Sequence, residues 1–137
     1  MHCSAELVCV DPDQVHEIWP YIAPLLKVAC TRTGLNAFAD IAADILSGCG
    51  LLWLAWSGQA IEAAAATILI NSEIGKVCVI TVCSGRGMAR WLPLITEIEN
   101  YARAEGCVCV RIYGRKGWLR ALDGYEAKHI IMDKELS

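Results

Sequence analysis

The chain has 137 residues, of which 55% are hydrophobic and 20% are charged, and its formal net charge is −3. A chain of this length forms one domain, so we expect residues 1–137 to be a single domain. The apolar content excludes intrinsic disorder, and the negative charge argues against a general nucleic-acid-binding protein.

The first third of the sequence predicts one strand and two helices. Residues 6–10 form a short apolar run, and apolar residues then recur at helical spacing over residues 13–29. Pro20 and Pro24 interrupt that pattern, so we expect a kink or two short helices there. A second amphipathic helix is predicted over residues 38–46, before the glycines that follow.

The middle of the sequence predicts three strands. Residues 51–56, 61–70 and 76–83 are rich in branched, aromatic and cysteine side chains. Polar, glycine-containing breaks separate the three runs, which is typical of an antiparallel meander. Four consecutive alanines at residues 63–66 favour a helix by propensity alone, so this strand has the weakest pattern of the three.

The last third predicts a helix, a strand, a short helix and a final strand. A glycine-rich segment leads into a helical pattern that begins close to Gly87 and ends at Gly106. Residues 107–113 predict a buried strand, residues 118–122 a short helix and residues 125–132 a last strand. The expected order is therefore β-α-α-β-β-β-α-β-α-β.

Two other classes of protein are not indicated. The longest uncharged stretch, residues 45–61, contains several glycines and serines, whereas a bilayer-spanning helix needs about 20 mostly apolar residues. The first residues lack a basic segment followed by an apolar run, so we expect no signal peptide and no membrane insertion. A soluble, cytoplasmic protein is the remaining expectation.

The cysteines predict core residues rather than a disulfide scaffold or a metal site. There is no C-x-x-C pair, and the three histidines are scattered along the chain. Most cysteines lie in apolar runs, where a reduced thiol packs as a small hydrophobic group. The eight cysteines are at positions 3, 9, 30, 49, 78, 83, 107 and 109.

A candidate binding site lies between a predicted strand and a predicted helix, in the segment Ser84-Gly85-Arg86-Gly87-Met88-Ala89. Glycines allow a tight turn and bring backbone N–H groups close to a ligand. The first N–H groups of a helix have no intrahelical partner, and the helix dipole adds about half a positive charge there. Such a turn can bind a phosphate or pyrophosphate, although a purely structural turn has the same pattern.

Basic side chains are concentrated in the second half of the sequence. Residues 1–76 contain 3 basic and 8 acidic side chains, whereas residues 77–137 contain 9 basic and 7 acidic ones. They form either a solvated rim or an anchor for a polyanionic ligand, because Arg matches the geometry of phosphate. Five of them lie in the loop or near the turn after the next strand: Arg86, Arg90, Arg115, Lys116 and Arg120.

The element order, this loop and the segment Trp118-Leu119-Arg120-Ala121-Leu122-Asp123-Gly124-Tyr125-Glu126 resemble the GNAT-type N-acetyltransferase superfamily. The resemblance covers essentially the whole chain and is strongest over residues 76–135. It implies an α/β (α+β) fold with a mixed, mostly antiparallel central sheet flanked by helices. The family's loop, Gln/Arg-x-x-Gly-x-Gly/Ala, wraps the pyrophosphate of acetyl-CoA.

In this chain Gly87, Met88 and Ala89 match the Gly-x-Ala half of the pattern, and Ser84 stands where Gln or Arg is usual. The resemblance implies no metal, and acetyl-CoA as the co-substrate. The residues that it implies for acetyl-CoA binding are Val82, Cys83, Ser84, Gly85, Arg86, Gly87, Met88, Ala89 and Arg90.

The resemblance also implies a mechanism. Two central strands, ending near Cys83 and Tyr113, splay apart, and the pantetheine arm lies between them with backbone hydrogen bonds. A small-molecule or protein amine then attacks the thioester directly. A base or water chain removes the proton, and backbone N–H groups stabilise the oxyanion. No protein nucleophile is required, which agrees with the lack of a recognisable Ser-His-Asp or Cys-His set.

The family's usual tyrosine acid falls here on Arg120, which cannot act as a proton donor near neutral pH. Tyr113, Tyr125 or water therefore takes this role, unless catalysis has been lost. Glu73 and Glu62 are the carboxylates nearest the central strands, and we take Glu73 and Tyr125 as the catalytic candidates.

Three functions remain open at this stage. The first is transfer of an acetyl group from acetyl-CoA to an amine. The second is a catalytically inactive protein of the same fold that acts as a CoA-binding or assembly module, since large apolar patches often mark a partner surface. The third is a different α/β nucleotide-binding protein. A homodimer is also left open, and residues 13–50, which would shape the acceptor site, carry no recognisable motif.

Overall fold

The structure, a computed structural model, describes residues 6–85, 88–114 and 116–137, and for residues 88–91 and 116 it describes the backbone alone. Its strands are β1 (Glu6–Cys9), β2 (Gly50–Trp56), β3 (Ile61–Ser72), β4 (Gly75–Gly85) and β5 (Cys109–Ile112). Its helices are α1 (Val15–Thr33), α2 (Phe38–Leu46) and α3 (Met88–Ala104), with short 3-10 helices η1 (Pro12–Gln14) and η2 (Lys116–Arg120).

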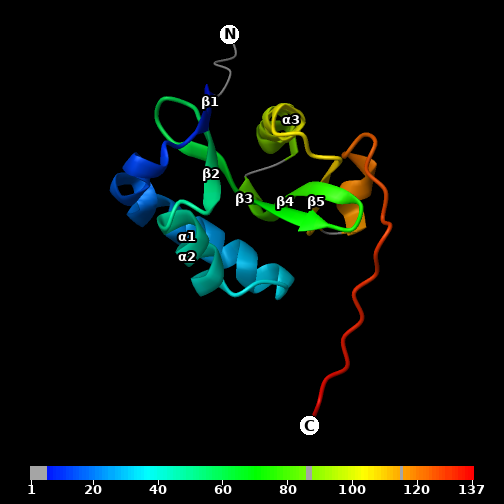
Figure 1. Cartoon of the computed structure of the whole chain (residues 1–137). Helices are drawn as coiled ribbons and strands as arrows, with labels where there is room; N and C mark the ends of the chain where they lie inside the picture. Colours follow the sequence, from blue (N-terminus) through cyan, green and yellow to red (C-terminus); the bar gives the residue numbers. More distant parts are fainter. Residues whose placement is uncertain (1–5, 86–87, 115) are drawn as a thin grey trace.

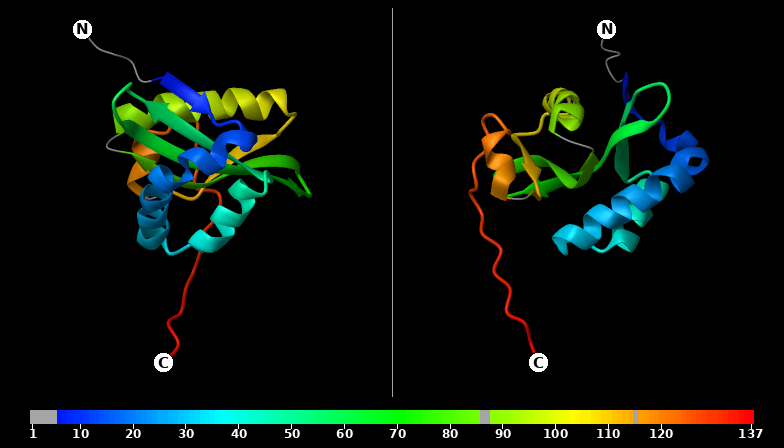
Figure 2. Two further views of the ribbon diagram at one scale, coloured as in Figure 1. Left: turned by 90° about the vertical axis from the view of Figure 1, so that its left-hand side faces the viewer. Right: turned by 180° about the vertical axis from the view of Figure 1, so that it is seen from behind.

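One five-stranded sheet in the order β1-β2-β3-β4-β5 organises the chain. Each neighbouring pair is antiparallel except β4 and β5, which are parallel and are joined by α3. Helices α1 and α2 cover one face of the sheet and α3 covers the other (Figures 1 and 2). This confirms the mixed, mostly antiparallel sheet flanked by helices, including the antiparallel meander.

The run of alanines in β3 is a strand because helices pack on both of its faces. Ala64 and Ala66 belong to the hydrophobic cluster under α1 and α2, whereas Ala63 and Ala65 belong to the cluster under α3. All four are at most 2% exposed. Small side chains let both helical layers approach the sheet closely, so tertiary packing overrides the helical propensity of alanine.

The expectation of two short helices at the prolines of α1 is wrong, since a single helix runs from Val15 to Thr33. Pro20 and Pro24 are both exposed, one turn apart, while Ile22 and Leu26 are fully buried. The carbonyls that lose a hydrogen bond to the prolines therefore face water, and the buried face continues without interruption. The helix ends at Gly34, whose φ of 65° allows its N–H to donate to the Cys30 carbonyl over 2.9 Å.

The expected last strand is also wrong. The structure shows no strand or regular helix beyond η2 in residues 121–137, and residues 126–137 are exposed. The apolar pattern of residues 125–132 is typical of a strand, but a strand forms only against a partner that completes its backbone hydrogen bonds. The short helix predicted at residues 118–122 is present as the 3-10 helix η2, shifted two residues towards the N-terminus.

The cysteines are less buried than the sequence suggests. Cys30 and Cys78 are buried, but Cys9, Cys49 and Cys109 are exposed, and each cysteine that the structure describes is free. Within the same described residues, no cluster of three or more His, Cys, Asp or Glu side chains could hold a metal ion. None of the described helices is sufficiently long and apolar to cross a bilayer.

A buried hydrogen bond at the centre of the sheet gives a test of the packing. The Trp53 indole Nε1 donates to the Thr67 hydroxyl over 3.0 Å, and Thr67 is 3% exposed. Thr67→Val would leave the indole N–H without its partner and should lower the free energy of unfolding by about 1–3 kcal/mol in urea titrations. Thr96→Val, at an exposed helix position, is the matched control and should change it by less than about 0.5 kcal/mol. Equal effects of the two substitutions would contradict this account.

Candidate functional site

The candidate site lies where β4 and β5 stop pairing. The two strands pair from Val77 to Ile80 of β4, and the Tyr113 N–H makes one more, long contact of 3.4 Å with the Ile80 carbonyl. β4 nevertheless continues to Gly85, which pairs with Ala63 of β3 on the other side. Residues 82–85 therefore have a strand on one side and, among the described residues, none on the side of β5. The backbone groups of these residues on the side of β5 therefore lack a strand partner, and we call this stretch the open edge of β4.

A bulge in β4 coincides with the end of this pairing. The register between β3 and β4 shifts beside Ala66, which leaves Thr81 as an extra residue in β4. The Asn36 amide, in the loop between α1 and α2, donates to the Thr81 carbonyl over 2.9 Å. The Thr81 hydroxyl donates to the Ala66 carbonyl over 3.3 Å. The α1–α2 loop is thereby fixed to the point where the pairing of β4 with β5 ends.

Beyond the bulge, successive side chains of β4 enter opposite layers. Val82 packs in the cluster under α1 and α2, whereas Cys83 packs against the cluster under α3. Burial raises the pKa of the Cys83 thiol to about 12. At neutral pH this thiol is protonated and is a poor nucleophile. Cys83, close to the end of the β4–β5 pairing, is thus suited to packing and not to forming a covalent acyl intermediate.

The predicted cofactor loop lies, as expected, between the end of a strand and the start of a helix. Ser84 is half-buried and Gly85 is exposed at the end of β4, and α3 begins at Met88, so Ala89 and Arg90 lie in its first turn. Arg86 and Gly87 lie outside the described residues. The first N–H groups of α3 have no intrahelical partner by the geometry of a helix and follow directly on the open edge. The contacts that these residues make with a ligand stay a prediction.

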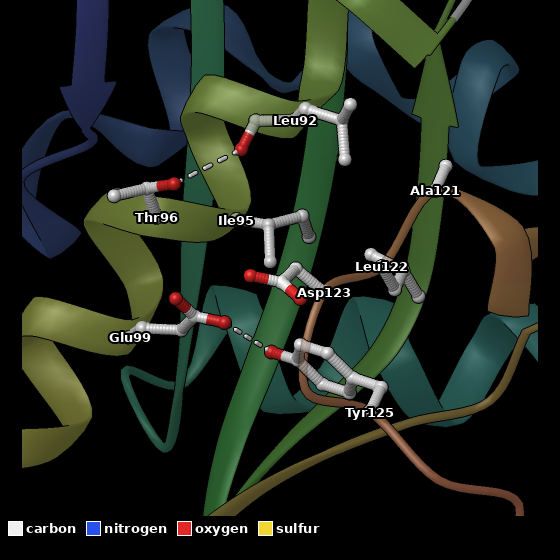
Figure 3. A pocket seen from close by; sticks show the side chains of 8 residues that line it. All are labelled: Leu92, Ile95, Thr96, Glu99, Ala121, Leu122, Asp123 and Tyr125. Atoms are coloured by element: carbon white, nitrogen blue, oxygen red, sulfur yellow. Dashed lines mark hydrogen bonds between the residues drawn. The ribbon is translucent and has the colours of Figure 1, made fainter.

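Tyr125 lies elsewhere, against α3. Its hydroxyl donates to the Glu99 carboxylate over 2.7 Å, and burial, followed by this hydrogen bond, raises the pKa of Tyr125 far above its ordinary value. Figure 3 shows the hydroxyl pointing to α3 across a cavity of about 230 Å³. At about 1.5 Å per residue, Glu99 lies about 16 Å along α3 from Met88. The structure therefore does not bring Tyr125 to the predicted loop.

Sequence reasoning did not single out Glu99. A signal was available, because it follows Leu92, Ile95 and Thr96 at helical spacing and so shares their face of α3. A carboxylate on such a face needs a hydrogen-bond donor, which Tyr125 supplies. The cavity is lined by Leu92, Ile95, Thr96, Glu99, Ala121, Leu122, Asp123 and Tyr125.

The two candidate carboxylates lie at opposite ends of the β3–β4 hairpin. Glu73 is exposed in the turn between these strands, at the start of β4. The 11 residues of β4, at about 3.3 Å each, separate that turn from Gly85 by more than about 30 Å. Glu62 is half-buried and directly precedes Ala63, the partner of Gly85. The structure thus brings Glu62, and not Glu73, to the end of β4 that leads into the loop.

The sequence also indicated Tyr113 and several basic residues as candidates near the end of the β4–β5 pairing. Tyr113 directly follows β5 and is half-buried. Arg120 is exposed, and among the described side chains no ion pair joins it to Asp123. Arg86 and Arg115 lie outside the described residues, and Arg90 and Lys116 are described by their backbone alone.

Several solved structures that are similar to this chain are described as acetyltransferases. An aminoglycoside N-acetyltransferase in complex with CoA matches with a TM-score of 0.71 at 12% identity, covering 98% of this chain and 97% of that chain. A predicted acetyltransferase with acetyl-CoA from Clostridium acetobutylicum gives 0.66 at 12% identity, covering 93% and 95%. An acetyltransferase of Trypanosoma brucei gives 0.66 at 18% identity, covering 96% and 99%.

No family model and no curated protein matches this sequence. At these low identities the structural likeness concerns the fold. The chain has the GNAT fold of these acetyltransferases, as the element order and the loop implied.

The environment of Cys83 leads to a test of its chemistry. A pKa of about 12 in place of 9.0 lowers the thiolate fraction at pH 8 about a thousand-fold. Iodoacetamide should therefore modify the exposed Cys49 and Cys109 in the folded protein long before Cys83, as followed by peptide mass spectrometry. In urea the rates should converge. Modification of Cys83 as fast as of Cys49 in the folded protein would show a reactive thiol and contradict its packing role.

Proposed function

We propose that this protein transfers an acetyl group from acetyl-CoA to an amine. The observation that carries the proposal is the early end of the β4–β5 pairing at Ile80, shortly before β4 ends at Gly85 and α3 begins at Met88. The fold adds support, because two structures that share it were solved with CoA or acetyl-CoA. The free cysteines fit a reducing compartment such as the cytoplasm.

The open edge and the turn would hold two successive parts of acetyl-CoA. Backbone groups of residues 82–85 have no strand on the side of β5 among the described residues, so they would pair with the amides of pantetheine as with an added strand. Residues 86–87, for which the sequence predicts a turn, and the first N–H groups of α3 would bind the pyrophosphate. When bound, acetyl-CoA supplies an activated acetyl thioester at this edge.

Glu62 is the carboxylate that would accept the proton of the attacking amine. It lies beside Ala63, whose partner in β4 is Gly85, and is half-buried. The protonated thiol of Cys83 argues for direct attack without an acyl-enzyme. The departing CoA thiol resembles a cysteine thiol, with a pKa of about 8.5, so water suffices to protonate it. Arg120 at the usual tyrosine position is therefore compatible with turnover.

Acetyl-CoA binding separates this enzyme from a non-catalytic module of the same fold. At 100 times its Kd, acetyl-CoA should stabilise the protein by about 2.7 kcal/mol in thermal melting. Gly87→Glu should abolish this shift, because a carboxylate would stand where the backbone meets the pyrophosphate. Gly117→Glu is the matched control, since nothing lies within 4 Å of a Cβ at Gly117. No shift for the unmodified protein at millimolar acetyl-CoA would contradict the proposed function, and a shift retained in Gly87→Glu would contradict the site.

The role of Glu62 is tested by comparison with Glu73. With a panel of primary amines that includes aminoglycosides, Glu62→Gln should lower kcat about a hundred-fold, because a general base contributes about 10²–10⁴-fold. Glu73→Gln, at the far end of the hairpin, should leave kcat unchanged. CoA release measures turnover, and the acetyl-CoA melting shift shows that the site is intact. Equal activity of the two variants would remove Glu62 from the mechanism.

A further inference from the structure

Asn36 holds the bulge of β4 from the helical layer on one face of the sheet. The bulge leaves Thr81 without a partner residue in β3, and a half-buried carbonyl in that position needs another hydrogen-bond donor. Asn36 supplies it, since its side-chain Nδ2 lies 2.9 Å from the Thr81 carbonyl oxygen, 45 residues further along the chain. The Thr81 hydroxyl donates in turn to the Ala66 carbonyl over 3.3 Å. The extra residue is therefore held at two atoms, one from the helical layer and one from β3.

The loop that contains Asn36 is itself fixed at both ends. Helix α1 ends at Gly34, whose N–H donates to the Cys30 carbonyl over 2.9 Å. Helix α2 begins at Phe38, whose ring stacks on Trp19 of α1 with the ring centroids 5.9 Å apart. Asn36 is half-buried between these two anchors. A short loop held in this way has little freedom to follow the strand, so the hydrogen bond constrains β4 as well as the loop.

The position of the bulge decides which backbone groups of β4 face the open edge. Successive residues of a strand present their N–H and carbonyl groups to opposite sides. If Thr81 paired with Ala66, every later residue of β4 would move by one position in the ladder. The backbone groups of residues 82–85 that now face the side of β5 would then turn to β3, and Val82 and Cys83 would exchange their hydrophobic layers. The bulge thus fixes the hydrogen-bonding pattern that an added chain would meet.

We propose that Asn36 is a positioning residue, which fixes the bulge through the Thr81 carbonyl and thereby sets the affinity of the open edge of β4 for acetyl-CoA. The effect on affinity rests on the proposed function, whereas the effect on the edge does not. Asn36 acts through Thr81 and not on the reacting atoms, so it changes the binding of acetyl-CoA more than the chemical step. Loss of its hydrogen bond should weaken that binding about ten-fold, because the edge is no longer held in the binding geometry.

Amide hydrogen exchange of the unliganded protein, followed by NMR, tests whether Asn36 fixes the edge. Asn36→Asp keeps the size of the side chain but replaces its donor by a carboxylate, which repels the Thr81 carbonyl. Exchange in residues 82–85 should become about ten-fold faster, whereas residues 77–80, before the bulge, should exchange as in the unmodified chain. Asn71→Asp makes the same change at an exposed position near the other end of the β3–β4 hairpin, and this matched control should alter neither stretch.

Thr81→Val removes the second anchor of the bulge and should give the same pattern as Asn36→Asp, so the test does not depend on one variant. Circular dichroism of each variant shows that the domain is folded. An equal increase of exchange in residues 77–80 and 82–85 would indicate a general loss of stability and would overturn the positioning role. Unchanged exchange in residues 82–85 of both variants would overturn it as well.

Calorimetric titration with acetyl-CoA tests the effect on affinity. Asn36→Ala, which adds no charge, should raise the Kd of acetyl-CoA about ten-fold, and Asn71→Ala should leave it unchanged. At saturating acetyl-CoA, kcat of Asn36→Ala should stay within about two-fold of the unmodified chain, so that KM changes and kcat does not. An equal Kd for Asn36→Ala and the unmodified chain would overturn the link to affinity. If the unmodified chain itself does not bind acetyl-CoA, the proposed function is wrong, and the exchange in residues 82–85 decides whether Asn36 fixes the edge.

Discussion

The end of pairing between β4 and β5 at Ile80 is the constraint on which the rest of the candidate site depends. The bulge inserts Thr81 as one extra residue of β4 between the partners of Ala66 and Thr67, and the pairing of β5 with β4 ends at this point. Because Asn36 donates to the Thr81 carbonyl, the bulge is fixed from the α1–α2 loop as well as from within the sheet. Both the open edge and the direction in which β4 leads into α3 follow from this local arrangement.

The two hydrophobic layers explain why such an opening is tolerated. The alanines of β3 fill the centre of both layers, and neither depends on contacts between residues 82–85 and β5. Val82 and Cys83 still enter opposite layers, which anchors this part of β4 although one of its edges is open. Burial of Cys83 therefore has a structural purpose, and its raised pKa is a consequence of that burial. The groups that could contact a ligand at this edge are therefore backbone groups and neighbouring carboxylates.

Local patterns predicted most of the fold, and partners distant in sequence decided the rest. The meander, α2 and the start of α3 follow from periodicity and glycines. The single helix α1 could not be predicted in this way, because the destabilisation of a helix by Pro20 and Pro24 depends on which face of the helix they occupy. The choice between Glu62 and Glu73 required the hairpin register, since both lie close to breaks in the sequence. Tyr125 was a reasonable acid in the sequence, but Glu99, 26 residues away, holds its hydroxyl.

The two open edges of β4 and β5 differ in the kind of partner that they can accept. The edge at residues 82–85 is short and lies between two strands that are already joined at Ile80 and Ile112, so a narrow chain with few hydrogen-bonding groups suits it. The outer edge of β5 has no strand beside it among the described residues, so it can accept a longer strand. A strand there would hold β5, and Tyr113 after it, from the outside. A strand paired with the outer edge of β5 would thus fix the position of β5 without filling the open edge of β4 at residues 82–85.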